Sequence, residues 1–396
     1  MGKSTHSKVL GTSSKALLAV LLLALALTGC ATENKCSTKA TFFPPPPDDP
    51  HIQWLTGITN SKDLGVKESQ SSFSLVVTGS EKAAMIRKIG KSYGITAHKG
   101  KIYVAETNEG RVIVIDPIHA TYTYLKGLEN PKGVLMVPVN LTFDDDDNLY
   151  VADVGRGEIV VYDRDEKYVT SYGRDLGREP GKDVKTPVKP TDSVSEKPPK
   201  IVSVAYSHGK LFALDNGKSR IRVLNPKTGE QLEELGYIEK PNQSIRFPTN
   251  LTVDDKGALY VTNTGNNRVM KYDIDGNFLG SFGQNTDQFG NFVKPKGIAV
   301  DQAGRIYVVD GGTNVVQMFD DKFRLLTYFG WPGLETGSLS SPTGIAVTDD
   351  SALVQYYQKF AVSGFKLERI IFVVNQFGAD LCIPPVSIYG LGEMKK

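Results

Sequence analysis

Cysteine, histidine and tryptophan are scarce in this chain of 396 residues, which contains three, five and two of them. The three cysteines form no CxxC or CxxCH pattern, so we expect neither a zinc knuckle nor covalently attached haem. The HExxH and P-loop motifs are also absent. No catalytic residue, metal ligand or cofactor is therefore predicted from a motif.

An excess of charge is missing as well. Lysine and arginine number 46 against 44 acidic residues, and both signs are interspersed along the chain. Nucleic-acid binding needs a concentrated basic surface. We therefore expect no nucleic-acid partner.

Only one long apolar run occurs, ALLAVLLLALAL at 16–27, and it is too short for a membrane span. It follows Lys3, Lys8 and Lys15. A short apolar run behind positive charges is typical of an export signal, here residues 1–29.

The run ends at Leu27-Thr28-Gly29-Cys30, which resembles the lipobox of bacterial lipoproteins. The resemblance implies cleavage before Cys30 and acylation of its thiol, which would anchor the protein in a membrane. Ala31 follows rather than aspartate, which favours the outer membrane of the bacterial envelope. The alternative is an ordinary export signal that happens to contain a cysteine.

Residues 30–51 are polar and end in TFFPPPPDDPH. Four successive prolines favour an extended polyproline segment. We interpret this stretch as a tether that lifts the folded body off the lipid surface.

From residue 52 onward, short β-branched and aromatic runs alternate with Gly, Asn and Asp, a pattern that predicts many short strands. The segment YVTNTGNNRVMKYDIDGNFLGSFG at 260–283 returns as YVVDGGTNVVQMFDDKFRLLTYFG at 307–330. Each unit contains an aromatic residue, then a small or β-branched residue, and two positions later a polar residue. The six polar residues are Glu106, Asp153, Asp215, Asn263, Asp310 and Asn375.

Six such units with four strands each predict an all-β fold, a six-bladed β-propeller of four-stranded antiparallel blades. Three of the five spacings are 47 or 48 residues, and the two longer ones contain insertions at 174–200 and 350–366. The first insertion is charged and proline-rich, and the second could hold one short helix.

Two copies, at 248–273 and 295–320, resemble the NHL repeat, and the likeness extends over about residues 93–390. The resemblance implies a propeller. Because this repeat serves scaffolds, binding modules and a few lyases, it leaves the activity open.

The sixth unit is one strand short. Residues 52–58, IQWLTGI, have the character of the missing outer strand, and we expect them to pair with 386–391 and close the ring. Cys36 precedes this strand and Cys382 lies beside its partner. We hypothesise a Cys36–Cys382 disulfide, since exported cysteine pairs can oxidise. The alternative is a buried Cys382 thiol and a free Cys36.

The loops after the second strands should lie on the face where a propeller holds a central ligand. Their Gly and Asn residues suit tight turns, which is the simpler interpretation of these loops. The alternative is that they form a polar rim that contacts a partner. The candidate rim residues are Asn108, Arg156, Asn216, Asn267 and Asn314.

We expect the recurring polar residues to form hydrogen bonds that fix these loops, with Arg111, Arg220 and Arg268 as partners of Glu106, Asp215 and Asn263. The rival is a ring of oxygen ligands around an axial cation. His98, His119 and His208 fall on turns of the opposite face, and DDDD at 144–147 reads as a hairpin turn.

Two functions follow. The first is a monomeric, lipid-anchored, non-catalytic propeller that binds a protein or scaffolds an envelope assembly; analogy with similar lipoproteins suggests exported cytochromes as one partner class. The alternative is a propeller lyase or lactonase with a metal ion on the ring axis.

Overall fold

The computed structural model describes Gly2 and residues 40–65, 86–173, 199–236, 243–378 and 382–395. Outside these ranges lie the export signal (except for Gly2), both Cys30 and Cys36, and almost all of the 174–200 insertion. The expectations about these parts of the chain stay predictions. No helix within the described ranges combines the length and the apolar character that a bilayer crossing needs.

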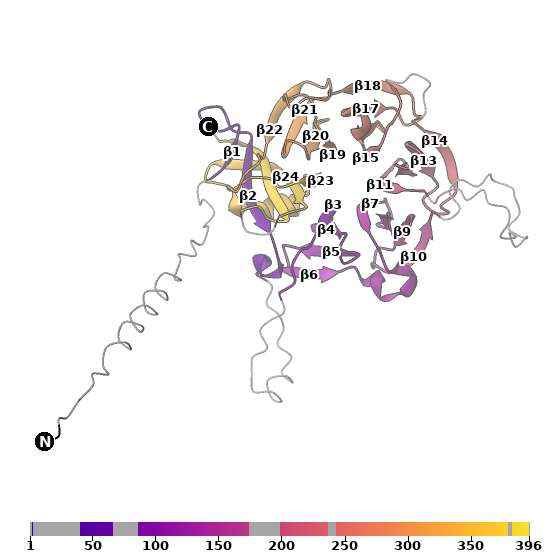
Figure 1. The fold of residues 1–396 in the computed structure, drawn as a ribbon, viewed down its shortest axis with the longest axis horizontal. Helices are drawn as coiled ribbons and strands as arrows, with labels where there is room; N and C mark the ends of the chain where they lie inside the picture. Colours follow the sequence, from indigo (N-terminus) through magenta and orange to yellow (C-terminus); the bar gives the residue numbers. More distant parts are fainter. Residues whose placement is uncertain are drawn as a thin grey trace, which may run out of the picture. The chain divides into compact units, whose positions relative to one another are not determined.

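Six antiparallel sheets surround one axis, which confirms the predicted propeller (Figure 1). We number these blades 1 to 6 in chain order. Blade 1 contains β3 (Ser92–His98), β4 (Lys101–Glu106), β5 (Arg111–Asp116) and β6 (Thr121–Tyr124). Blade 2 contains β7 (Pro138–Phe143), β8 (Leu149–Asp153), β9 (Glu158–Tyr162) and β10 (Tyr168–Tyr172). Blade 3 contains β11 (Ile201–Ser207), β12 (Lys210–Asp215), β13 (Arg220–Leu224) and β14 (Gln231–Leu235).

The second half of the ring repeats this plan. Blade 4 contains β15 (Pro248–Val253), β16 (Leu259–Asn263), β17 (Arg268–Tyr272) and β18 (Phe278–Phe282). Blade 5 contains β19 (Pro295–Val300), β20 (Ile306–Asp310), β21 (Val315–Phe319) and β22 (Leu325–Phe329). Blade 6 contains β23 (Pro342–Thr348), β24 (Phe365–Asn375) and β25 (Val386–Met394), and it is completed by β2 (Ile52–Ile58) and β1 (Phe42–Phe43).

The second and third strands of each blade are buried on both faces because every blade is sandwiched between two others. All five residues of β8 (LYVAD) and of β20 (IYVVD) are buried. The core therefore consists of apolar layers between adjacent blades. Outer strands such as β22 expose most of their residues, which explains their more polar composition.

The first hairpin turn of several blades is built around an aspartate. In blade 2, Asp144 accepts hydrogen bonds from Asp146 N (3.0 Å) and Asn148 N (2.7 Å), and the Tyr150 hydroxyl donates to its Oδ2 (2.9 Å). The Asp301–Tyr307 pair of blade 5 repeats this contact at 2.9 Å. These bonds confirm DDDD at 144–147 as a turn and explain the recurring Asp and Tyr spacing.

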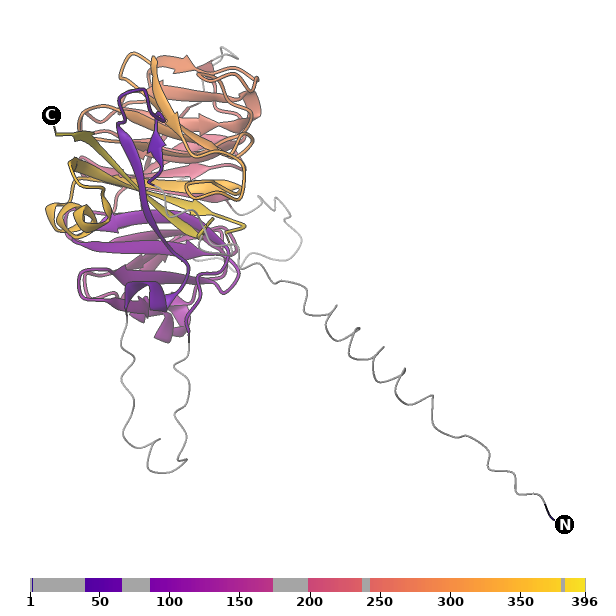
Figure 2. The same cartoon turned by 90° about the vertical axis from the view of Figure 1, so that its left-hand side faces the viewer.

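The ring closes as predicted, with β2 pairing antiparallel to β25 from Ile52–Leu391 to Ile58–Val386. Figure 2 shows β2 running along the strands of the last blade, far from it in sequence. Leu55 and Ile58 enter the apolar layer between blades 6 and 1. This pairing covers the edge of β25, which would otherwise expose unpaired backbone groups.

The tether ends earlier than we predicted. Phe42 and Phe43 form β1, which pairs with β2, so the interpretation of residues 42–51 as an extended spacer is wrong. Phe43 is 1% exposed and lies 4.8 Å from the Trp331 ring, centroid to centroid. Burial of this aromatic pair brings the proline-rich segment back against blade 6.

The 350–366 insertion contains the expected short helix, α3 (Ser351–Tyr357). The Asp350 carboxylate caps it by accepting hydrogen bonds from Ala352 N and Leu353 N. Leu353 and Tyr357 pack into the apolar layer beneath it. Short 3-10 turns lie at η1 (Ser61–Leu64), η2 (Lys126–Glu129), η3 (Pro131–Gly133), η5 (Thr264–Asn266) and η6 (Gln358–Phe360).

Candidate functional site

One face of the ring carries the segments that link successive blades and the loops between second and third strands; we call it the link face. Backbone bonds hold the two kinds of segment together, including Val154 N to Val137 O (3.1 Å) and Gly311 N to Lys294 O (3.0 Å). The innermost strands start here and run toward the opposite face. The end of the ring axis that opens on this face is called the axial mouth.

The six recurring acids and amides close each blade on the link face. All are 0–1% exposed. Asp153 accepts hydrogen bonds from Met136 N (2.6 Å) and Val137 N (2.9 Å), and Asp310 accepts them from Val293 N (2.9 Å) and Lys294 N (2.8 Å). The end of the second strand is thereby tied to the segment that enters the first. Backbone N–H groups donate to these carboxylates. This geometry matches the expected role in fixing the loops by hydrogen bonds rather than the alternative role as ligands of an axial cation.

Of the three predicted arginine partners, only Arg111 bonds as expected, with its Nε 2.5 Å from Glu106 Oε2. Arg220 pairs with Glu234 on the outer strand instead. Among the described residues Arg268 makes no bond to Asn263, whose side chain bonds Arg246 N (2.7 Å) and Ser244 O (3.1 Å).

The partner of Asp215 is Arg222, which the sequence spacing missed. Its Nε and Nη2 lie 3.0 Å and 2.9 Å from Asp215 Oδ2, and both side chains are at most 1% exposed. Arg222 lies opposite Ala213 in the strand register. The small alanine leaves room for the guanidinium to reach Asp215.

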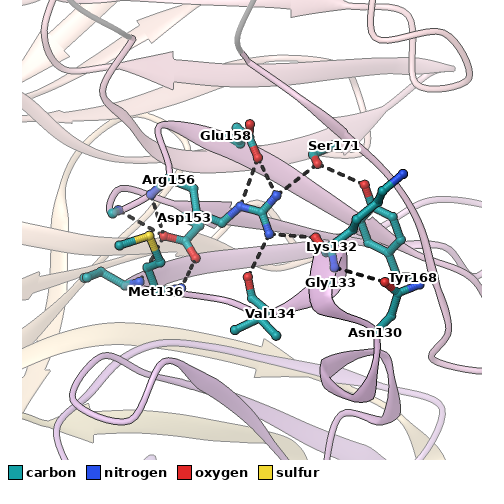
Figure 3. Close-up of polar contacts among 12 residues, drawn as sticks. Asn130, Lys132, Gly133, Val134, Met136, Asp153, Arg156, Glu158, Tyr168 and Ser171 are labelled. Carbon is teal, nitrogen blue, oxygen red and sulfur yellow. Dashed lines mark hydrogen bonds and ion pairs between the residues drawn. The ribbon is translucent and has the colours of Figure 1, made fainter.

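Arg156, a predicted rim residue, holds the link between blades 1 and 2 (Figure 3). Its Nη1 donates to the carbonyls of Lys132 (2.8 Å) and Val134 (2.7 Å). Its Nε and Nη2 bond Glu158 Oε2 at 2.9 Å and 2.5 Å, and Nη2 also contacts Ser171 Oγ at 3.2 Å. The guanidinium is therefore fully used in holding this link against blade 2.

Three predicted asparagines also join blades. Asn216 Nδ2 donates to Pro248 O (2.7 Å) and Asn267 Nδ2 donates to Val293 O (2.5 Å). Asn314 Oδ1 accepts from Ser341 N (2.9 Å). Asn267 and Asn314 have positive φ angles of 56° and 59°, which asparagine tolerates well.

The fifth rim residue, Asn108, is exposed and makes no side-chain hydrogen bond within the described ranges. The structure thus gives four of the five rim residues a joining role, and whether any of them contacts a partner stays a prediction.

Large apolar side chains stand exposed on the link face, which the sequence did not reveal. Met136, Phe247 and Val293 lie on links into blades 2, 4 and 5, and Phe377 lies in the loop after β24; we call them the link-face apolar residues. Their exposed fractions are 58%, 70%, 37% and 66%. Phe247 also has a positive φ of 45°, which is rare for a bulky residue.

Lysines surround the axial mouth. The residue directly before the first strand is exposed lysine in blades 1, 3 and 5, namely Lys91, Lys200 and Lys294. A fourth lysine, Lys296, is the second residue of β19 and is only 9% exposed. Burial, together with the charges of Lys294 and Lys91, lowers the pKa of Lys296 to about 8.

A cavity of about 170 Å³ lies on the axis, and on β19 its lining begins two residues beyond Lys296, at Ile298. The innermost strands of all six blades line it with aliphatic, threonine and asparagine side chains. No charged residue is part of this lining.

The histidines lie on turns away from the link face. His98 stacks on Phe143 at 4.0 Å between ring centroids and bonds Asp147 Oδ1 at 2.9 Å. His119 bonds Asp116 Oδ2 at 2.8 Å. Within the described part of the chain, no three His, Cys, Asp or Glu residues converge in a way that could hold a metal ion.

Cys382 is 6% exposed and takes part in a disulfide bond. The chain's other cysteines, Cys30 and Cys36, lie outside the described ranges. The pairing of Cys382 with Cys36 therefore stays a prediction.

No family model matches the sequence, and no curated protein matches it. The likeness to the NHL repeat consequently remains an interpretation of the sequence.

Solved structures do match. A protein of unknown function from Bacteroides thetaiotaomicron is 15% identical with a TM-score of 0.54, over 86% of this chain and 75% of that one. A gluconolactonase from Xanthomonas campestris is 14% identical with a TM-score of 0.50, over 91% and 99%. A virginiamycin B lyase from Staphylococcus aureus is 15% identical with a TM-score of 0.46, over 77% and 96%. Such low identity shows a shared propeller fold alone.

Proposed function

We propose that this chain is an exported, lipid-anchored propeller that binds a protein partner through its link face. The supporting observation is the exposure of Phe247 and Phe377 on that face. Exposed apolar groups ringed by polar residues mark interaction surfaces, and buried aromatic anchors carry most of the energy of an interface.

The backbone presents Phe247 to solvent. Its N–H is bonded to Ser219 Oγ (3.2 Å), and Pro248 starts the next strand directly after it. A positive φ at such a residue costs free energy of order 1 kcal/mol or more. Strain that directs a large ring into water supports a binding role, since folding by itself would favour burying that ring.

The lysines define the chemistry of the partner. Lys91, Lys200 and Lys294 are exposed on the same face as the link-face apolar residues. Electrostatic complementarity favours a partner whose contact surface joins an apolar centre to acidic groups. We therefore propose an acidic protein surface as the partner and no nucleic acid.

The proposal also includes a location, the cell envelope, which rests on the lipobox-like sequence at 27–30. The proposal includes cleavage before Cys30, lipidation of its thiol and a monomeric propeller held at the membrane, with the outer membrane favoured. An exported protein such as a cytochrome is a partner class compatible with that location.

The alternative, a lyase or lactonase with an axial metal, needs converging oxygen, nitrogen or sulfur ligands. The axial cavity supplies threonine and asparagine side chains and no carboxylate or imidazole. We therefore keep this function as an outcome of the test and do not propose it.

A photo-crosslinking amino acid placed at 247, at 377 or at 279 in intact cells tests the proposal. Leu279 is the matched control, because it is 54% exposed but lies on the outer strand β18. We expect positions 247 and 377 to capture the same protein and position 279 to miss it. Capture of unrelated proteins at 247 and 377 would contradict the proposal. One tightly held Ca²⁺ or Zn²⁺ per purified chain would favour the enzyme instead.

A further inference from the structure

We infer that the axial mouth binds a small oxyanion, a carboxylate or a phosphate group, with Lys296 as its anchoring cation. The inference concerns a small ligand at the ring axis and does not depend on the proposed protein partner.

Lys296 lies at a position where blades 4 and 6 have a threonine that joins neighbouring blades, whereas blades 1, 2 and 3 have Tyr93, Val139 and Val202 there. In blade 4 the equivalent residue is Thr249, whose Oγ1 donates to Pro295 O of blade 5 (3.1 Å). In blade 6 it is Thr343, whose Oγ1 donates to Tyr93 O of blade 1 (3.0 Å). Among the described residues nothing accepts a hydrogen bond from the Lys296 ammonium. An amine therefore replaces a bonded hydroxyl between blades 5 and 6.

Gly311 makes room for the lysine. A Cβ atom at Gly311 would lie 2.7 Å from Lys296 Cε, closer than real side chains approach. The other five blades have larger residues at this position, namely Thr107, Val154, Asn216, Thr264 and Gln376. Glycine and lysine thus occur together in blade 5 alone, which indicates that the loop accommodates this side chain.

The charged surroundings leave the ammonium without a counterion. Asp310, the acid at the end of the adjacent strand β20, accepts hydrogen bonds from Val293 N, Lys294 N and Gly312 N. The charges that act on Lys296 are those of Lys294 and Lys91, both positive. A nine-tenths buried cation beside two others is poorly compensated, and a bound anion would supply the missing charge.

The axial cavity, whose lining starts two residues further along β19 than Lys296, suits a small anion. Asn140 and Asn250 belong to its lining. The Oδ1 atom of Asn140 accepts from Val204 N (2.9 Å), which leaves the amide N–H₂ group available to a ligand. At about 30 Å³ per water-sized group, a volume of about 170 Å³ holds only a few non-hydrogen atoms. Inorganic phosphate or a short carboxylic acid fits this limit.

Protonation sets the pH range of binding. The amine of Lys296 is mostly an ammonium below about pH 8 and mostly neutral above it. An anion favours the ammonium, so binding raises the pKa of Lys296. Affinity for the anion is expected to fall roughly tenfold per pH unit above about pH 8.

Competitive amine labelling of the full-length protein, read by peptide mass spectrometry, tests the inference with inorganic phosphate and acetate as separate probes. Lys322, exposed on a turn of the opposite face, is the internal control. We expect Lys296 to reach half-maximal labelling near pH 8. A saturating probe should slow Lys296 labelling at least about tenfold and leave Lys322 unchanged. Protection by only one probe identifies the group that the mouth selects.

Two variants separate binding from folding, each followed by equilibrium dialysis with radioactive phosphate or acetate. Lys296→Thr copies blade 4, so it should fold, melt no lower than the parent and lose at least about tenfold in affinity. Gly311→Ala keeps the charge but obstructs the lysine stem and should also weaken binding, whereas Lys322→Met should not. Binding by Lys296→Thr as tight as by the parent, or no protection of Lys296 by either probe, would overturn the inference.

Discussion

Gly90 and Glu106 are matched to each other in blade 1. The Glu106 carboxylate lies directly against the Cα atom of Gly90, and any side chain at Gly90 would overlap Oε1. The other five blades have Asp or Asn at the position of Glu106 and a residue with a side chain at the position of Gly90. The longer acid, which reaches Arg111, is therefore accommodated by the absence of a Cβ.

This match predicts that Gly90→Ala lowers the free energy of unfolding by about 1–3 kcal/mol, because the added methyl overpacks a closed site. Glu106→Asp in the same background should recover part of the loss. Urea denaturation of the two single variants and the double variant measures the coupling. Strictly additive effects would show that the two residues do not touch.

The buried ion pair of blade 3 distinguishes Arg222 from Arg220. Arg222→Met leaves the Asp215 carboxylate buried without its cation, so we expect a loss of about 3–5 kcal/mol in unfolding free energy. Arg220→Met removes a partly exposed pair with Glu234 and should cost less than about 1 kcal/mol. Equal losses in denaturant titrations would contradict the assignment of Arg222 as the partner of Asp215.

Closure of the ring is testable at Gly57 on β2. A Cβ atom there would overlap the ring of Pro384, which precedes β25. Gly57→Ala should therefore lower the melting temperature, with a loss of about 1–3 kcal/mol from overpacking. Adding Pro384→Ala, which shortens the opposing side chain, should recover part of it, while Pro384→Ala by itself is the control. Absence of any recovery would argue against the contact between the two ends of the chain.

Oxidation at Cys382 gives a further prediction. If Cys36 is its partner, Cys36→Ala frees the Cys382 thiol and Cys30→Ala leaves it oxidised. Loss of the bond should cost about 2–4 kcal/mol, since a cross-link restricts the unfolded chain. Thiol counting in denaturant distinguishes the two variants. A Cys382 thiol that stays blocked in Cys36→Ala would rule out the pairing.

Lys296 predicts a pH-dependent stability. Its pKa falls from 10.5 to about 8 on folding, so between these values the unfolded chain binds more protons than the folded one. The penalty for burying the ammonium is present below about pH 8 and disappears as the pH rises toward 10.5. In buffers free of phosphate and carboxylate, Lys296→Met should be more stable than the parent at pH 7 by on the order of 2 kcal/mol. This difference should shrink by pH 10; a constant difference would contradict the shifted pKa.

The amino-acid sequence by itself determined the number of blades, the order of their strands and the closing strand at 52–58. These features depend on local chemistry, since strands buried on both faces must be apolar and their turns need Gly, Asn or Asp. The same pattern recurs in every unit. The repeat could therefore be identified from the sequence without knowledge of any contact between blades.

Only the tertiary structure decided which polar side chains are engaged in bonds within the ring and which remain available to a ligand or partner. Arg156 and Asn216 looked like a rim but bond the links, and Arg222 rather than Arg220 reaches Asp215. The isolation of Lys296 depends on what the neighbouring blade and Gly311 place around it. Such contacts depend on how far a side chain extends toward a neighbouring blade or loop that is distant in sequence. A local sequence period contains no information about which residues meet in this way.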